Sequence, residues 1–202
     1  MGNELKCNVR FGKQESPGRA LLESNEILFR GGFRLRIPFS TIKSAKAVDG
    51  ELRLQTENGI IVFEFGNAAE KWREKILHPK SRIEKLGVKP GAKVSLLGSF
   101  DSEFLGELDA LTKSIAKDKI TSGCDCIFLS ADSKEDFAPL PKTSKSMQGA
   151  AALWIVYPKG QKHITENDVL AAGRRVGLKD IRVVGFSITH TALKFVIPIS
   201  RR

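Results

Sequence analysis

Three kinds of feature are scarce in this sequence: cysteines, long apolar runs and catalytic motifs. The three cysteines, Cys7, Cys124 and Cys126, are odd in number and form no Cys-x-x-Cys pair, so we expect reduced thiols rather than disulfides or a zinc site. No apolar run reaches the length of a membrane-spanning helix. The charged start, MGNELKCNVRFG, lacks the apolar core of a secretion signal, and we therefore expect a cytoplasmic protein.

Motifs that would carry catalysis are also missing. The sequence has no Ser-His-Asp, Cys-His or Walker pattern, and neither His78 nor His163 has a partner at metal-ligand spacing. It therefore predicts no catalytic residue and no metal ion.

Positive charge is in excess but is spread along the chain. The formal net charge is +10; residues 1–80 carry 14 Lys and Arg against 10 Asp and Glu, and residues 81–202 carry 19 against 13. Basic proteins often contact nucleic acid or anionic membranes, but diffuse charge is also typical of an ordinary solvated surface. Both interpretations stay open at this point.

Residues 6–65 are expected to form about seven short strands. Turn signals separate them at Pro17-Gly18, Ser24-Asn25, Gly31-Gly32, Asp49-Gly50 and Asn58-Gly59. The period then changes to that of a helix over Ala68–Leu77, with Asn67 as the expected N-cap.

Seven antiparallel strands followed by one amphipathic helix resemble the pleckstrin-homology (PH) superfold, in particular the bacterial PH-like and GRAM-like domains. The resemblance covers about residues 5–78, and its most specific part is ESNEILFRGGFRLRIPFSTIKSAK, residues 23–46. It implies an all-β PH-like barrel with a C-terminal helix over residues 1–79. Such domains bind rather than react, so the resemblance implies a binding module.

A linker is expected over residues 80–91, because Pro79 and Pro90-Gly91 interrupt regular structure at its ends. Residues 92–202 then alternate between strand and helix. We expect strands at 92–97, 125–130 and 150–160, helices at 102–116 and from Thr165, and a hairpin over 181–199. This alternation predicts a mostly parallel α/β sheet. The apolar run AAALWIVYPKG, residues 150–160, shows no polar alternation and is expected to be a central strand, buried on both faces.

A mostly parallel sheet that ends in an antiparallel hairpin resembles the class I methyltransferases, which have a Rossmann-like fold. More closely, residues 83–199 are similar to a small bacterial family of unknown function with a truncated methyltransferase-like domain. The matching stretches are LGVKPG (86–91), ALWIVYPKG (152–160), the helix that begins at Thr165, and LKFV (193–196). The resemblance implies two domains, of which the second is a truncated Rossmann-like domain, and it implies no activity.

An active methyltransferase needs a glycine-rich turn after its first strand and an acid after its second, which binds ribose hydroxyls. The turn here, Gly98-Ser99-Phe100-Asp101, has one glycine and the bulky Phe100. Between Gly98 and Cys124 the sequence indicates one helix and no strand that ends in an acid. We therefore predict no cofactor and favour a binding or regulatory protein over an enzyme.

In open α/β sheets, ligands bind at the carboxyl ends of the strands. The sequence places Gly98, Ser99, Asp132, Lys159 and His190 there. Lys159 and His190 could bind an anion, with Asp132 orienting one of them. The alternative is that Lys159 lies in a strand-ending turn, His190 at a hairpin tip and Asp132 in a cap, without a ligand.

Six basic residues of the first domain are candidates for an anion site. Arg10, Lys13 and Arg19 flank the first hairpin, where lipid-binding PH domains hold phosphate, and Arg30, Arg34 and Arg36 form a second basic face. The alternative is that all six are solvated positions on a curved sheet.

Three functions stay open from the sequence. The first is a binding or regulatory protein with a protein partner or an anionic ligand. The second is an enzyme with an unusual cofactor site at the carboxyl edge of the α/β sheet. The third is a weak binder of anionic membranes or nucleic acid.

Overall fold

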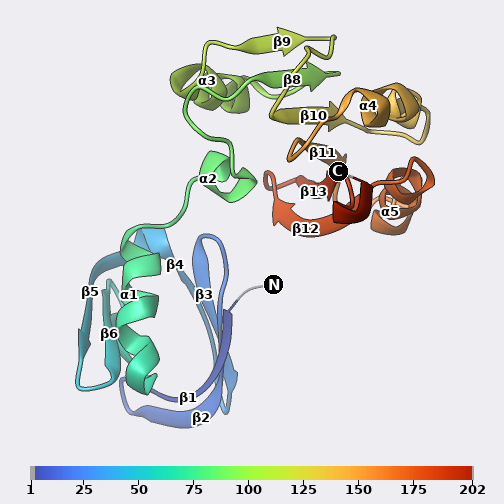
Figure 1. Ribbon diagram of the computed structural model, residues 1–202. Coiled ribbons are helices and arrows are strands. Elements are labelled where there is room, and N and C mark those ends of the chain that lie inside the picture. Colours follow the sequence, from blue (N-terminus) through green and yellow to red (C-terminus); the bar gives the residue numbers. More distant parts are fainter. Residues whose placement is uncertain (1–2, 202) are drawn as a thin grey trace. The chain divides into compact units, whose positions relative to one another are not determined.

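The first unit, Met1–Lys80, is built on one curled antiparallel sheet in the computed structural model, which describes residues 3–201. Its strands lie in the order β4-β3-β2-β1-β7-β6-β5, and helix α1 (Ala69–Leu77) follows them (Figure 1). The strands are β1 (Asn3–Phe11), β2 (Gln14–Leu22), β3 (Glu26–Gly31), β4 (Arg34–Pro38), β5 (Ile42–Val48), β6 (Glu51–Thr56) and β7 (Gly59–Glu64). The expected seven strands and the helix after them are present.

Alternation along these strands gives the sheet one apolar side, on which α1 packs. Phe29 and Phe63 are buried there, and their rings meet edge to face with centroids 6.4 Å apart. The ring of Trp72, on the buried stripe of α1, lies 4.2 Å from that of Phe65. The predicted helical stripe, which also contains Ala69 and Ile76, is therefore buried.

Two local predictions in this unit are wrong. Pro17-Gly18 is not a turn but part of β2; the chain turns earlier, at Gly12, which has a positive φ of 59°. Pro17 fits a strand here because the pairing of β2 with β3 begins only at Gly18, so its missing N–H leaves no gap in that ladder. Asn67 is not the N-cap of α1: the helix is preceded by a 3-10 turn over Gly66–Ala68, and Ala68 takes the cap position without a side-chain bond.

The second unit, Ser81–Arg202, contains a six-stranded mixed sheet in the order β12-β13-β11-β10-β8-β9. The strands are β8 (Val94–Leu97), β9 (Ile115–Lys117), β10 (Cys126–Ser130), β11 (Ala152–Pro158), β12 (Lys179–Gly185) and β13 (His190–Val196). Strands β9, β8, β10 and β11 are parallel, whereas β13 runs antiparallel to both of its neighbours. The predicted parallel strands and terminal hairpin are present.

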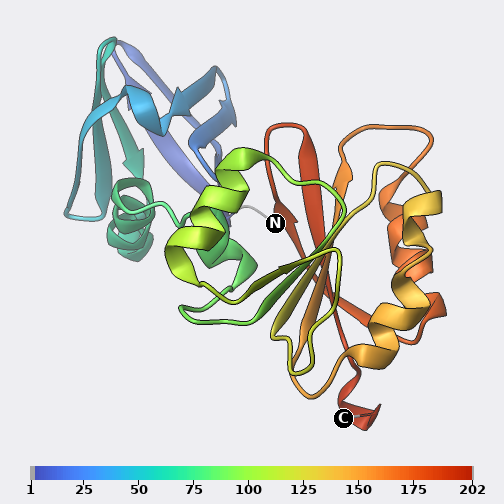
Figure 2. The same ribbon diagram turned by 90° about the horizontal axis from the view of Figure 1, so that it is seen from above.

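Helices cover both faces of this sheet (Figure 2). The helices are α2 (Arg82–Leu86), α3 (Ser102–Leu111), α4 (Leu140–Ser146) and α5 (Glu166–Arg175). Helices α2 and α3 contribute Leu86 and Phe104 to one apolar cluster, and α4 and α5 contribute Leu140 and Val169 to the other. Strand β11 is buried along Ala152–Tyr157, as its apolar run predicts.

Two expectations for this unit need correction. The segment expected to be a linker, 80–91, contains α2, and Ile83, Leu86 and Val88 are buried in the core of the second unit. The helix expected over 102–116 ends at Leu111. On β11, Trp154 is completely buried and belongs to the apolar cluster of α2 and α3.

The shorter helix makes room for a strand that periodicity could not reveal. Thr112 ends α3, and its hydroxyl donates to the carbonyl of Ala92. The chain then forms β9, only three residues long, which pairs with β8. Because Ile115 also continues the apolar spacing of the helix, the sequence pattern concealed the change.

Candidate functional site

The topology brings three predicted site residues to the same edge of the mixed sheet. Asp132 follows the carboxyl end of β10, and Lys159 follows that of β11. His190 is the first residue of β13, which is antiparallel to β11, so it lies opposite Pro158 at the end of β11. Strand direction therefore decides this convergence.

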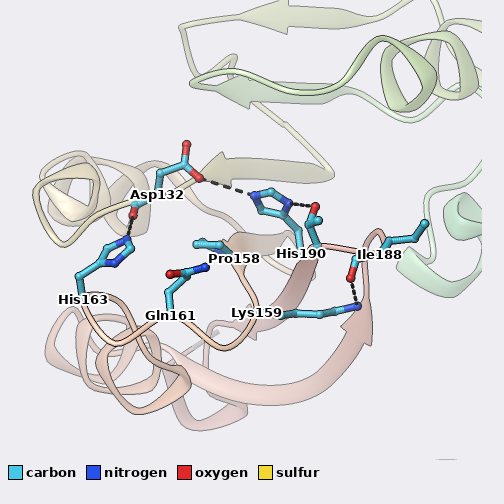
Figure 3. Close-up of a pocket in the computed structure, with 8 residues that line it drawn as sticks. Asp132, Pro158, Lys159, Gln161, His163, Ile188 and His190 are labelled. Carbon is cyan, nitrogen blue, oxygen red and sulfur yellow. Dashed lines mark hydrogen bonds and ion pairs between the residues drawn. The ribbon is translucent and has the colours of Figure 1, made fainter.

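These residues line an open pocket of about 710 Å³ (Figure 3). Its lining residues are Asp132, Pro158, Lys159, Gln161, His163, Ile188, Thr189 and His190. Gln161 and His163 were not among the site residues expected from the sequence. They lie in the same loop as Pro158-Lys159-Gly160, and their place after a strand end was the signal that could have indicated them.

Asp132 interacts with both histidines of the pocket. The Nε2 atom of His163 lies 3.0 Å from the backbone oxygen of Asp132, and Nε2 of His190 lies 3.6 Å from its carboxylate oxygen Oδ1 (Figure 3). Since a carbonyl oxygen only accepts, the hydrogen bond places a proton on Nε2 of His163. Nδ1 of His190 is 2.9 Å from Oγ1 of Thr189, which orients the ring. Asp132 therefore holds two imidazoles at the rim of one pocket.

The ammonium group of Lys159 is engaged by the neighbouring hairpin loop. Its Nζ donates to the backbone oxygens of Ser187, at 2.6 Å, and Ile188, at 3.2 Å. The backbone N–H of Lys159 also donates to the oxygen of Thr189. Lys159 thus ties the loop of the β12–β13 hairpin to the end of β11, so that its direct role is to shape this wall of the pocket.

Tyr157 is buried next to this wall and keeps its proton. Its hydroxyl donates to Oε2 of Glu166, in the first turn of α5, at 3.2 Å. Burial raises the pKa of Tyr157 above its ordinary value, and the charge of Glu166 and this hydrogen bond raise it further. Tyr157 therefore acts as a hydrogen-bond donor that attaches α5 to the end of β11.

Gly98 and Ser99 lie outside the lining of this pocket, at the carboxyl end of β8. Gly98 has a φ of +85°, and a side chain at this position would approach the oxygen of Ser130, at the end of β10, to 3.3 Å. After β8 the chain adds β9 on one side of it and then β10 on the other, so the strand order reverses between β8 and β10. Ligands bind at such a reversal in open α/β sheets. Gly98 therefore stands at the reversal point, one strand away from the pocket.

An acid does follow the second strand of this unit, contrary to our sequence interpretation. Asp118 comes directly after β9, has a positive φ of 55°, and accepts a hydrogen bond from the Gly98 N–H at 3.4 Å through Oδ1. The bulk of Phe100 is also a weaker argument against a cofactor-binding turn than the sequence indicated. Its ring packs with the apolar cluster, 5.5 Å from that of Phe104 and 6.3 Å from that of Phe186.

The N-terminus of α3, beside Gly98, is filled by the protein's own carboxylate. Asp101 caps the helix by accepting from the N–H of Phe104 at 2.7 Å, and Glu103 adds a second negative charge in the first turn. Arg82 pairs with Asp101 at 3.3 Å and with Glu107 at 2.9 Å. The Asp101 cap already uses the Phe104 N–H, and the negative charges of Asp101 and Glu103 disfavour a phosphate group at this terminus.

The six predicted basic residues of the first unit fall into two groups. Arg10 pairs with Glu51 and Glu64, Arg19 with Glu4, and Arg36 with Glu26. In the described part of the chain, the side chains of Lys13, Arg30 and Arg34 form no ion pair or hydrogen bond.

The described residues show no metal site and no helix that could span a membrane. Within residues 3–201, no group of three His, Cys, Asp or Glu side chains is arranged to hold a metal ion. The three cysteines are free thiols. None of the helices described is both long enough and apolar enough to cross a membrane.

Comparison with known proteins gives distant structural likenesses. No protein-family model and no curated protein matches this chain. A TehB-like SAM-dependent methyltransferase from Corynebacterium glutamicum is 15% identical over 65% of this chain and 97% of its own length, with a TM-score of 0.39. The magnesium protoporphyrin IX methyltransferase of Synechocystis PCC 6803 is 13% identical over 57% of this chain and 74% of its own, also with 0.39. The mitomycin 7-O-methyltransferase MmcR is 8% identical over 64% of this chain and 57% of its own length, with a TM-score of 0.41. The chain therefore spans just over half of that protein.

Proposed function

We propose that this is a binding or regulatory protein whose second unit holds a small polar ligand in the pocket at the carboxyl ends of β10 and β11. The observation that carries this proposal is the convergence of Asp132, His163 and His190 on one open pocket of about 710 Å³. Pockets of this size, with a few convergent polar groups, are typical of small-molecule sites.

The chemistry of the lining indicates what the ligand carries. The carboxylate of Asp132 accepts hydrogen bonds, the amide of Gln161 both donates and accepts, and the imidazoles donate and become cationic when protonated. Because Lys159 is engaged by loop carbonyls, an anionic group on the ligand would face the histidines. The ligand we propose therefore combines an anionic group with at least one donor for Asp132.

A thermal-shift screen with small anionic metabolites tests this proposal, since a ligand that binds only the folded protein raises its melting temperature. We expect a shift that His190→Ala abolishes and His78→Ala, at an exposed histidine of the first unit, leaves unchanged. Equal shifts in both variants, or no shift from any compound, would overturn the assignment of the pocket.

We also propose that the two units are separate domains, a PH-like barrel over residues 1–79 and a truncated, methyltransferase-like Rossmann domain over residues 92–202. The curled seven-stranded sheet followed by α1 supports the first assignment. The parallel strands β9, β8, β10 and β11, continued by an antiparallel hairpin, support the second. The helix α2 within 80–91, with Ile83 and Leu86 buried in the core of the second unit, supports extending the proposed second domain to include this segment.

A second candidate function, an enzyme with an unusual cofactor site at the carboxyl edge, is supported by Asp118. Gly98 lets a ligand approach the backbone closely, and the Asp118 carboxylate beside it is suited to accept bonds from ribose hydroxyls. The capped α3 terminus disfavours a phosphate group, so the residues fit a nucleoside without phosphates, such as S-adenosylmethionine. That cofactor supplies a methyl group when bound.

Calorimetry with S-adenosylmethionine decides between the two functions. The cofactor hypothesis expects binding that Asp118→Asn weakens at least tenfold, whereas Asp109→Asn, at an exposed position of α3, leaves it unchanged. No heat of binding at millimolar cofactor would contradict this hypothesis and leave the non-catalytic one.

A further inference from the structure

Four cations form one row across the outer side of the first unit's sheet. In the strand register, Lys6 lies opposite Arg19, Arg19 opposite Arg30, and Arg30 opposite Arg34. All four side chains are exposed. Adjacent strands lie about 4.8 Å apart, so this cationic row extends about 14 Å across β1–β4.

The charges of the cationic row are largely uncompensated. Within the described residues its one carboxylate partner is Glu4, which is 2.8 Å from Arg19. Other arginines on the same side of the sheet are paired: Arg36 with Glu26, and Arg53 with Glu51 at 2.8 Å. Like charges directly opposite each other destabilise a sheet, so the row carries a repulsion that a bound polyanion would relieve.

The surroundings of the row indicate the kind of polyanion. Among the described residues, no large apolar side chain is exposed on β1–β4, so this surface offers nothing to insert into a lipid bilayer or to fill a pocket of a protein partner. The outward positions of these strands also hold no aromatic residue on which single-stranded bases could stack. What the surface does offer is three guanidinium forks and an ammonium group, which suit phosphate oxygens.

We propose that the cationic row binds the phosphate backbone of duplex nucleic acid without reading its sequence. The row is about as long as the major groove is wide, about 12 Å, so it can contact phosphates on both sides of a groove. Arg30 and Arg34, which have no carboxylate partner in the described chain, are the principal contacts.

The salt dependence of binding tests this proposal. The full chain is titrated into a fluorescein-labelled 20-base-pair DNA duplex between about 50 and 200 mM NaCl, with fluorescence anisotropy as the readout. Each neutralised phosphate contributes about −0.9 to the slope of log K against log salt, so three to four contacts predict a slope of about −3 to −4. Arg30→Gln/Arg34→Gln should reduce the magnitude of this slope by about two.

The matched control is Arg36→Gln/Arg53→Gln, which removes the same charge from the same side of the sheet but at carboxylate-paired positions. It should change the slope by less than half a unit. Thermal melting checks that both variants stay folded. An equal reduction of the salt slope in both variants would show that the binding does not depend on the cationic row. That result would overturn the proposal, as would a failure to bind the duplex at 50 mM salt, or row-dependent binding to vesicles of anionic lipid without binding to duplex.

Discussion

Trp154 contributes to the second unit mainly through burial. It is completely buried on β11, and Lys194 places its ammonium group 5.5 Å from the ring centroid. Replacing a buried Trp by Ala typically costs about 3–5 kcal/mol through lost transfer energy and a cavity. A small domain has only about 5–15 kcal/mol of stability. We expect Trp154→Ala to remove a large part of the free energy of unfolding of this unit, measured by urea denaturation.

Lys159, just beyond the end of the same strand, is the matched control. Its exposed side chain makes two hydrogen bonds to the hairpin loop, each typically contributing about 0.5–1.5 kcal/mol. Lys159→Ala should therefore cost about 1 kcal/mol. If both variants were equally stable, the buried central strand would be the wrong explanation of the apolar run.

At the scale of elements, Gly173 allows α5 to pack closely against the sheet. A Cβ atom on Gly173 would come within 2.2 Å of the Phe195 ring, which is completely buried on β13. Ala favours helix over Gly by about 1 kcal/mol, but overpacking of a core typically costs about 1–3 kcal/mol. We expect Gly173→Ala to lower the free energy of unfolding, because the added methyl group would have to displace the buried Phe195 ring.

For Gly106, in the middle of α3, we expect the opposite effect on stability. A Cβ atom there would meet nothing within 4 Å, so Gly106→Ala should stabilise the protein by about 0.5–1 kcal/mol. Urea denaturation of both variants measures the difference. If both variants were more stable than the wild type, helix propensity, and not the contact with Phe195, would decide the effect.

The start of α5 carries a pH-dependent contribution to stability. Asp168 pairs with Nζ of Lys134 at 2.7 Å and accepts bonds from the Thr165 hydroxyl and N–H at 2.7 and 2.9 Å. The bond from Lys134, and then those from Thr165, lower the pKa of Asp168 from 3.8 to about 2. Because the folded state favours the ionised form, this contribution is complete above about pH 5 and is lost as the pH falls from about 4 to about 2.

Asp168→Asn measures this contribution, because Asn retains a capping oxygen but not the charge. The difference in melting temperature between the wild type and this variant should be constant above about pH 5 and shrink towards zero between about pH 4 and pH 2. A difference that does not change over that range would exclude the ionised carboxylate as its source.

At the scale of the whole molecule, each compact unit holds one of the two tryptophans, Trp72 in the first and Trp154 in the second. Trp154→Phe leaves Trp72 as the reporter of the first unit, and Trp72→Phe leaves Trp154 as the reporter of the second. If the units are separate domains, the two reporters should give different urea midpoints.

Limited proteolysis tests the same division. We expect cuts at residues 78–81, before α2, and no cuts within 82–91, because this segment is partly buried in the core of the second unit. Coincident midpoints and cuts within strands would contradict this division.

Local chemistry in the sequence was sufficient for many elements. The Asp49-Gly50 turn, the start of a helix at Thr165 and the buried β11 all follow from neighbouring residues, and all three are confirmed. Where two patterns competed, the sequence misled us. Pro17 occurs in a strand because one side of it is unpaired, and Ile115 continued a helical spacing although the chain had already become β9.

The sequence by itself determined that strands would be followed by alternating strands and helices, and that polar residues would follow the strand ends. Only the tertiary structure decided which of these residues meet. Parallel strands put Asp132 and Lys159 on one edge, and the antiparallel β13 brought His190 to them, whereas the three-residue β9 placed Asp118 beside Gly98. Those contacts depend on strand order and direction, which are set by packing between distant segments and which leave no local pattern in the chain.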